Sequence, residues 1–171
     1  MNKAVTNGLL FGGTTIIIGL TIYTFSKPMF LNPGLRFILS LIIPITFMTK
    51  SGLEKRQELG GFARFTEILQ PTFLTLVVGT LIFSIFQYIM MSVDYELLEI
   101  QKEIAVKSLE SISGIMNMSE EDLADVQAID PIEMKPTIRG LMMGLSKNFI
   151  LGFIIAVVIS LILKRKNLVS G

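Results

Sequence analysis

The chain alternates between long apolar stretches and short polar ones. Residues 4–26, 37–49, 68–93 and 148–163 contain no Asp, Glu, Lys or Arg. Uncharged apolar runs approaching about 20 residues indicate membrane-spanning helices, because lipid offers backbone amides no partner outside the helix itself. The pattern predicts an all-α integral membrane protein, a four-helix bundle that forms a single membrane domain over residues 1–171. The expected spans are 4–26, 33–49, 68–92 and 138–163.

Proline marks the expected helix ends. Pro28 stops the first span, because proline cannot continue a helix and disfavours helical geometry in the residue before it. Asn32 and Pro33 supply an N-cap and a first helical position for the second span, and Pro136 is a similar start for the fourth. Pro44 predicts a kink inside the second span, where neighbouring helices cover the freed carbonyl group.

The composition limits the kinds of catalytic and binding site that the chain can form. The chain of 171 residues is 51% hydrophobic and has no histidine or cysteine, which removes the usual ligands of zinc, haem and iron–sulfur clusters. Its formal net charge of +1 gives no global basic field for nucleic acid. The apolar runs hold no carboxylate, and no nucleophile–base pair, HExxH motif or phosphate-loop motif is present. We therefore expect no enzyme activity, no cofactor, no metal site and no nucleic-acid partner.

Charge is segregated along the chain. All but three of the 14 acidic residues fall between residues 92 and 136, whereas Lys and Arg gather at residue 3, at 50–64 and at 164–166. The positive-inside rule then predicts that both termini face the cytoplasm and that the acidic segment faces the opposite, outer side of the membrane. Arg36 and Lys147 are expected to reach the outer headgroups by snorkelling. The first apolar run is longer than a signal-peptide core and has no Ala-x-Ala-like site, so we expect it to be retained.

The acidic segment, residues 93–135, predicts a helical hairpin between the third and fourth spans. Its first part carries apolar residues at helical spacing with charged residues elsewhere on the wheel. This apolar stripe consists of Leu98, Ala105, Leu109, Ile112 and Met116. A capping-box pattern at residues 119–122 predicts a second short helix that ends near Ile129. The stripe is covered either as a self-packed cap, or by a partner or second copy, or by a ligand beneath a lid.

The polar stretch between the second and third spans forms an elbow. Its named positions are Arg56, Gly60, Gly61 and Arg64. Apolar residues at spacings of three and four after Gly61 predict an interfacial amphipathic turn, and the two glycines let the chain bend. A connector is the favoured interpretation, and a binding or regulatory elbow is the alternative.

Small residues at helical spacing predict close helix packing. Glycines in register let two helix backbones approach each other. These glycines are Gly8, Gly12, Gly140, Gly144 and Gly152. Polar residues inside the spans, Thr80 and Gln87 among them, are expected to form hydrogen bonds between helices and not to line a substrate path.

Three motifs together resemble a known family. They are the Gly8-Leu-Leu-Phe-Gly-Gly13 start, the Arg56-Gln-Glu-Leu-Gly-Gly61 element preceded by Lys50, and the Val93-Asp-Tyr-Glu-Leu-Leu98 opening of the acidic segment. In this order they resemble a Bacteroidota membrane family described as domain of unknown function 4199. The resemblance implies four helices in the bacterial cytoplasmic (inner) membrane, and it implies no catalytic residue.

Two classes of function fit these features. The first is a non-enzymatic accessory or scaffold subunit that contacts a membrane or periplasmic protein, or a second copy, through the hairpin. The alternative is a small transporter or lipid-handling helix bundle, which Pro44, Pro71 and the threonine-rich helix faces favour. Membrane lipids are expected to contact the protein in either case.

Overall fold

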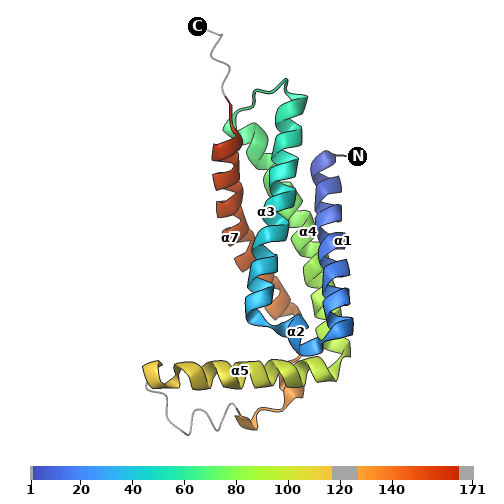
Figure 1. Ribbon diagram of the computed structural model, residues 1–171, viewed down its shortest axis with the longest axis vertical. Coiled ribbons are helices and arrows are strands. Elements are labelled where there is room, and N and C mark those ends of the chain that lie inside the picture. The colour runs from blue at the N-terminus through green and yellow to red at the C-terminus, as the bar shows by residue number, and fades with distance from the viewer. Residues whose placement is uncertain (1, 117–126, 166–171) are drawn as a thin grey trace.

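The computed structural model describes residues 2–111 and 127–165 in full, together with the backbone of residues 112–116 (Figure 1). Every regular element in this part of the chain is a helix. The elements are α1 (Lys3–Phe25), α2 (Lys27–Leu31), α3 (Pro33–Glu58), α4 (Phe65–Val93), α5 (Tyr95–Met116), the 3₁₀ helix η1 (Pro131–Met134) and α7 (Ile138–Leu163). Four of them, α1, α3, α4 and α7, are long and apolar enough to cross a membrane, as predicted. The second predicted helix of the acidic segment falls mainly on residues 117–126, outside the described residues.

Helix α3 starts where the sequence predicts and ends later. The Asn32 side chain accepts a hydrogen bond of 3.0 Å from the Leu35 amide, so the helix begins at Pro33. Its end at Glu58 lies well beyond the predicted limit of residue 49. Lysine and glutamate end the apolar run, but they are good helix formers, so the helix continues into the polar region. The helix also runs through Pro44 without a break.

Proline has a second effect that the hydrophobic pattern does not reveal. Ser26 accepts a hydrogen bond of 3.3 Å from the Met29 amide and caps a new helix, α2, with Pro28 in its first turn. The proline that ends α1 therefore begins α2. Helix α7 starts at Ile138 because Thr137 caps it through a hydrogen bond of 3.0 Å from the Gly140 amide.

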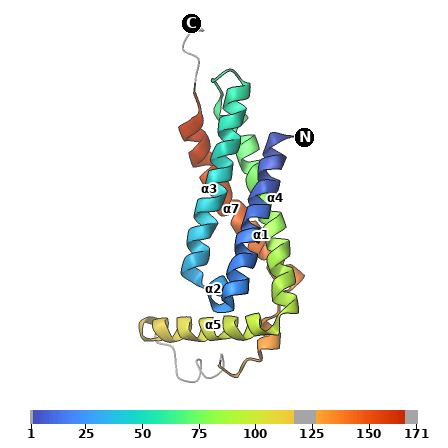
Figure 2. The ribbon, with the colours of Figure 1, turned by 45° about the vertical axis from the view of Figure 1, so that its right-hand side comes forward.

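The four long helices stand side by side, and α4 contacts each of the other three (Figures 1 and 2). The start of α1, the end of α7 and the α3–α4 connection lie at one end of the bundle, which we call the terminal end. Helix α5 lies across the other end, called the α5 end, and extends sideways beyond the bundle in both views. The start of α1 and the end of α7 thus share an end, as four antiparallel crossings require.

The bundle packs most tightly along α1 and α4 and in its terminal half. A Cβ on Gly8 would lie 2.6 Å from Val78 Cβ, and one on Gly12 would lie 2.8 Å from Ile82 Cβ, so these glycines let α1 approach α4. The core of the terminal half joins α3, α4 and α7. Its buried members are Met48, Ala63, Ile68, Leu76, Ala156, Ile159 and Leu163.

The glycines of α7 divide into two groups. A Cβ on Gly152 would overlap Leu76 of α4, so this glycine lies at a close helix contact. A Cβ on Gly144 would meet nothing within 4 Å, and one on Gly140 would meet only Thr137 of its own N-cap. The close packing expected at Gly140 and Gly144 is therefore not found within the described chain, because the buried cluster between α7 and α4 begins beyond them, near Gly152.

Large apolar side chains also cover the outside of the bundle. Ile17 is 67% exposed, Phe37 65% and Ile162 75%. Such residues surround the long helices. The surface that they form is solvated well by hydrocarbon and poorly by water. The arrangement is that of a multi-pass membrane protein.

Candidate functional site

The elbow between α3 and α4 is fastened to the end of α7. Ala63 and Arg165 exchange two backbone hydrogen bonds of 3.1 and 3.0 Å. The Arg56 guanidinium donates a hydrogen bond of 3.4 Å to the carbonyl oxygen of Leu163, which is one of the last carbonyls of α7. These contacts account for the elbow as a structural connector.

The remaining elbow residues shape its turn. Gly60 and Gly61 have φ angles of +73° and +90°, where side chains with a Cβ are strained. Arg64 precedes α4, and its backbone amide donates a hydrogen bond of 2.7 Å to Glu67. The Arg64 guanidinium also contacts this carboxylate at 3.1 Å, so its charge is engaged locally.

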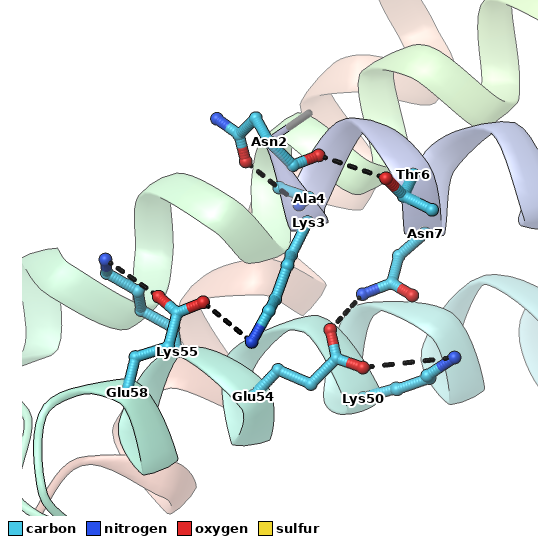
Figure 3. A network of polar contacts seen from close by, with 9 residues as sticks. All are labelled: Asn2, Lys3, Ala4, Thr6, Asn7, Lys50, Glu54, Lys55 and Glu58. Atoms are coloured by element: carbon cyan, nitrogen blue, oxygen red, sulfur yellow. Dashed lines mark hydrogen bonds and ion pairs between the residues drawn. The ribbon is translucent and has the colours of Figure 1, made fainter.

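A polar network joins α1 to α3 at the terminal end (Figure 3). Asn7 is buried and donates a hydrogen bond of 2.7 Å to Glu54. Lys3 lies 3.0 Å from Glu58. A polar residue inside the first apolar run was the only sequence signal for this contact.

A second polar cluster lies at the α5 end. The Lys27 ammonium lies 2.7 Å from Asp94 and 2.6 Å from Glu96, and Tyr23 donates a hydrogen bond of 2.6 Å to Asp94. Hydrogen bonds to Asp94 and Glu96 raise the pKa of Lys27. Burial alone would raise the pKa of Asp94, but the hydrogen bonds from Lys27 and Tyr23 outweigh it and the pKa is lowered. The cluster thus fastens the start of α5 to α1 and α2.

Helix α5 begins as part of this cap. Leu97 and Leu98 are fully buried and pack with Phe30 and Leu31 of α2 and with Met91 of α4. The assignment of Leu98 to a partner surface is therefore wrong, because its side chain fills the core of its own chain.

The rest of the apolar stripe is less covered. Ala105 and Leu109 are half-buried, and the side chains of Ile112 and Met116 lie outside the described residues. The chain from Gln127 onward lies near α5, with a hydrogen bond of 3.4 Å from Gln127 to Glu110. Of the three arrangements predicted to cover the apolar stripe, the self-packed cap is the one found in the first turns of α5.

A cleft of about 490 Å³ lies among the long helices, with all four contributing to its walls. Phe11, Leu76 and Gly152 line its deep part, and these residues are buried among α1, α4 and α7. Pro33 and Phe30 line it near the α5 end. Its volume is within the range of about 300–1,000 Å³ that is typical of small-molecule sites.

Five polar side chains that line this cleft make no hydrogen bond or ion pair with any described residue. They are Arg36, Thr80, Ser84, Gln87 and Asn148, and we call them the unpaired cleft side chains. By contrast, Thr15 and Ser40, which also line the cleft, donate hydrogen bonds of 2.8 Å to carbonyl groups of their own helices. The helix-to-helix hydrogen bonds expected for Thr80 and Gln87 are absent from the described chain.

The family assignment is clear. A family described as "Protein of unknown function (DUF4199)" matches residues 6–165. The chain belongs to this family. No curated protein and no solved structure matches the chain.

The chemistry of the cleft follows from its lining. No acidic residue lines it, and Arg36 is its one cation among the described lining residues. Lys147 is exposed and lies beside Asn148 in sequence, but it does not line the cleft. Among the described residues, no group of three or more acidic side chains is arranged to hold a metal ion. In this DUF4199 protein the cleft offers hydrogen-bonding groups and one positive charge within apolar walls.

The sequence contains the residues of this site but does not indicate that they lie together in the fold. The sequence predicts that Arg36 reaches the lipid headgroups by snorkelling and that Thr80 and Gln87 form hydrogen bonds between helices. Asn148 continues the row of Gly140 and Gly144 at a step of four, and Ser84 is a single small polar residue of a kind that is common in membrane helices, so neither indicates a binding site by itself. The spacing of Thr80, Ser84 and Gln87 by four and three residues was the available signal, since it places them on one face of a helix.

Proposed function

We propose that this protein binds an amphipathic molecule of the membrane in the cleft among its four long helices. The supporting observation is the set of unpaired cleft side chains. Polar groups in an apolar environment are costly unless they are hydrogen-bonded, so polar side chains that face an apolar cleft favour a ligand that pairs with them. A ligand with a polar part and an apolar part would satisfy both the unpaired groups and the apolar walls.

The cleft favours binding and handling of a ligand over conduction through the bundle. Its terminal side is filled by the core around Met48, Ile68 and Leu163. A site that is closed at one end holds a molecule, and transport would need a second conformation. This supports the lipid-handling alternative ahead of a channel.

Thiol protection tests this function directly, because the natural chain has no cysteine. Ser84→Cys places a thiol in the cleft, and Ser146→Cys places one on the exposed surface of α7 as the matched control. In purified, delipidated protein, adding a polar lipid extract should slow maleimide labelling at position 84 several-fold and leave position 146 unchanged. Equal labelling rates with and without lipid at position 84 would refute the proposal.

The membrane and the orientation are proposed on the charge distribution. Lys3, Lys50, Lys55 and Arg56 belong to the terminal end, which favours the cytoplasmic side of a bacterial inner membrane, and α5 would then face the periplasm. Gln57→Cys and Gln127→Cys test this in intact cells with a membrane-impermeant thiol reagent. We expect labelling at 127 alone. Labelling at 57 alone would reverse the orientation.

A second function, an accessory subunit, is supported by the position of α5. The helix extends beyond the bundle, and Ala105 and Leu109 on its predicted stripe are only half-buried (Figure 1). A membrane or periplasmic protein, or a second copy, would be the partner. Leu109→Asp should release this partner in a gentle detergent purification, while Ser108→Asp, a change at an exposed neighbour, should not. Unchanged assembly of Leu109→Asp would exclude this role for the stripe.

A further inference from the structure

The charged, polar and apolar side chains that line the cleft follow one another in order from one end to the other. Arg36 lies in the first turn of α3, about 5 Å along the axis from its start at the α5 end. On α4, Gln87 lies about 9 Å and Thr80 about 20 Å from the helix end at Val93. The positive charge is therefore near the mouth, neutral hydrogen-bonding groups follow, and Phe11, Leu76 and Gly152 line the apolar depth.

The charge at the mouth has no counter-ion in the described chain. Among the described residues, no carboxylate lies within 4 Å of the Arg36 guanidinium, and none lines the cleft. Lys27 differs in this respect, because Asp94 and Glu96 neutralise it. The planar guanidinium stays charged at all physiological pH values and its fork of N–H groups matches the oxygens of phosphate. An anion is the complementary ligand group at this position.

The walls of the cleft select a lipid anion over a soluble one. Most lining residues are apolar, and they would gain nothing from a small hydrophilic ion. Phe37 of α3 and Leu151 of α7 line the cleft and are 65% and 62% exposed, so the cleft wall continues into the outer apolar surface of the bundle. A molecule from the bilayer reaches the cleft along this surface without passing through water.

We propose that the cleft binds a phospholipid of the bilayer, with its phosphate on Arg36 and an acyl chain along the apolar depth. Gln87 and Asn148 are then positioned to donate hydrogen bonds to oxygens of the headgroup or of the ester linkage. This inference rests on the proposed amphiphile-binding function and adds the chemical class of the ligand. It assigns Arg36 a binding role in place of simple snorkelling.

The test compares two lipids with the same acyl chains, of which one carries a phosphoglycerol headgroup and the other only a hydroxyl group. The full chain, delipidated in detergent, is titrated with phosphatidylglycerol and with diacylglycerol of the same acyl chains, and bound lipid is counted by native mass spectrometry. Phosphatidylglycerol should bind at least about tenfold more tightly, the effect expected for one charge-assisted contact. Arg36→Gln should remove this preference and leave diacylglycerol binding unchanged, and Arg36→Lys should retain most of it. Arg139→Gln, which removes an exposed cation outside the cleft, is the matched control.

The possible outcomes distinguish an error in the ligand class from an error in the proposed function. Equal binding of the two lipids, or an unchanged preference in Arg36→Gln, would overturn the phosphate assignment while the cleft still binds amphiphiles. Failure of both lipids to bind and to protect the thiol of the Ser84→Cys variant would overturn the proposed function itself. Competition by glycerol phosphate as strong as that by phosphatidylglycerol would show a site for soluble anions and also refute the lipid assignment. Gel filtration, together with normal maleimide reactivity when Ser84→Cys is combined with Arg36→Gln, verifies that the arginine variant is folded.

Discussion

The Lys27 ammonium lies 2.7 Å from the Asp94 carboxylate and joins the short helix after the first span to the residue before α5. The same carboxylate accepts a hydrogen bond from Tyr23 of α1. The junction of α1 and α2 therefore meets the junction of α4 and α5, which is distant in sequence, at one carboxylate. This cluster holds the cap over the α5 end.

Replacing Asp94 should loosen that cap. Asp94→Ala leaves Lys27 with Glu96 as its one described carboxylate partner and removes the Tyr23 acceptor, so we expect a loss of about 1–3 kcal/mol of stability, as for a hydrogen-bonded charge. Thermal unfolding in detergent measures it. Glu99→Ala on the exposed side of α5 is the control and should change little. Equal melting temperatures for wild type and Asp94→Ala would contradict a fastening role.

The cluster also predicts a pH dependence. The pKa of Asp94 is lowered in the fold, so its contribution is present above its ordinary value of 3.8 and is lost as the pH falls through the lower folded pKa. The pKa of Lys27 is raised, so its contribution persists through neutral pH and is lost only in strong alkali. The stability difference between wild type and Asp94→Asn should therefore be constant near neutrality and shrink below about pH 4. A difference that disappears near neutral pH would contradict this assignment.

Glycine substitutions should separate real helix contacts from motif matches. Gly79→Ala would drive a Cβ into the Phe11 ring and should cost about 1–3 kcal/mol, as overpacking does. Gly144→Ala meets open space and should be neutral or slightly stabilising, because alanine favours the helix. Melting temperatures of the two variants decide between them. Equal destabilisation at both positions would show that Gly144 also packs closely, for example against a second copy.

Two leucines of α5 should respond differently to a charge. Leu98 is fully buried in the cap, so Leu98→Asp should cost several kcal/mol, because an unpaired carboxylate enters an apolar core. Leu109 is half-buried, and Leu109→Asp should leave the monomer close to wild-type stability. Thermal unfolding and limited proteolysis of α5 measure both effects. A stable Leu98→Asp protein would place this side chain outside the core.

The elbow should depend on its positive backbone angles. Gly61→Val imposes a β-branched side chain at a φ of +90° and should cost about 1–3 kcal/mol of local stability. Because Ala63 in this elbow pairs with Arg165, trypsin should cut after Arg165 faster in the variant. Gly13→Val, at a glycine with open space around it, is the control for added bulk. Unchanged cleavage would mean that the pairing does not depend on the turn.

Much of the fold was predictable because the hydrophobic effect acts directly on the pattern of apolar residues along the chain. Uncharged runs identified the four long helices, and Asn32 with Pro33 predicted the start of α3. The end of α3 was not predictable from hydropathy, since Lys50 and Glu54 leave the apolar pattern while the helix continues. Leu98 was misplaced for a related reason: periodicity indicates that a helix face is covered but does not identify the cover.

The candidate site could not be predicted from the sequence. Thr80, Ser84 and Gln87 come from α4, Asn148 from α7 and Arg36 from α3, and no local pattern connects them. Glycine motifs gave equal weight to Gly144 and Gly152, although only Gly152 faces a neighbouring helix.

The sequence by itself determined the four apolar helices, their order and the shared end of the two termini, because transfer into lipid depends on composition over each run of residues. Only the tertiary structure decided which polar side chains found partners. Asn7 met Glu54 and Lys27 met Asp94, whereas Arg36 faced the cleft with no described counter-ion. The physical reason is that hydrogen bonds and ion pairs act over a few ångströms, so they depend on distances that exist only once the helices have packed.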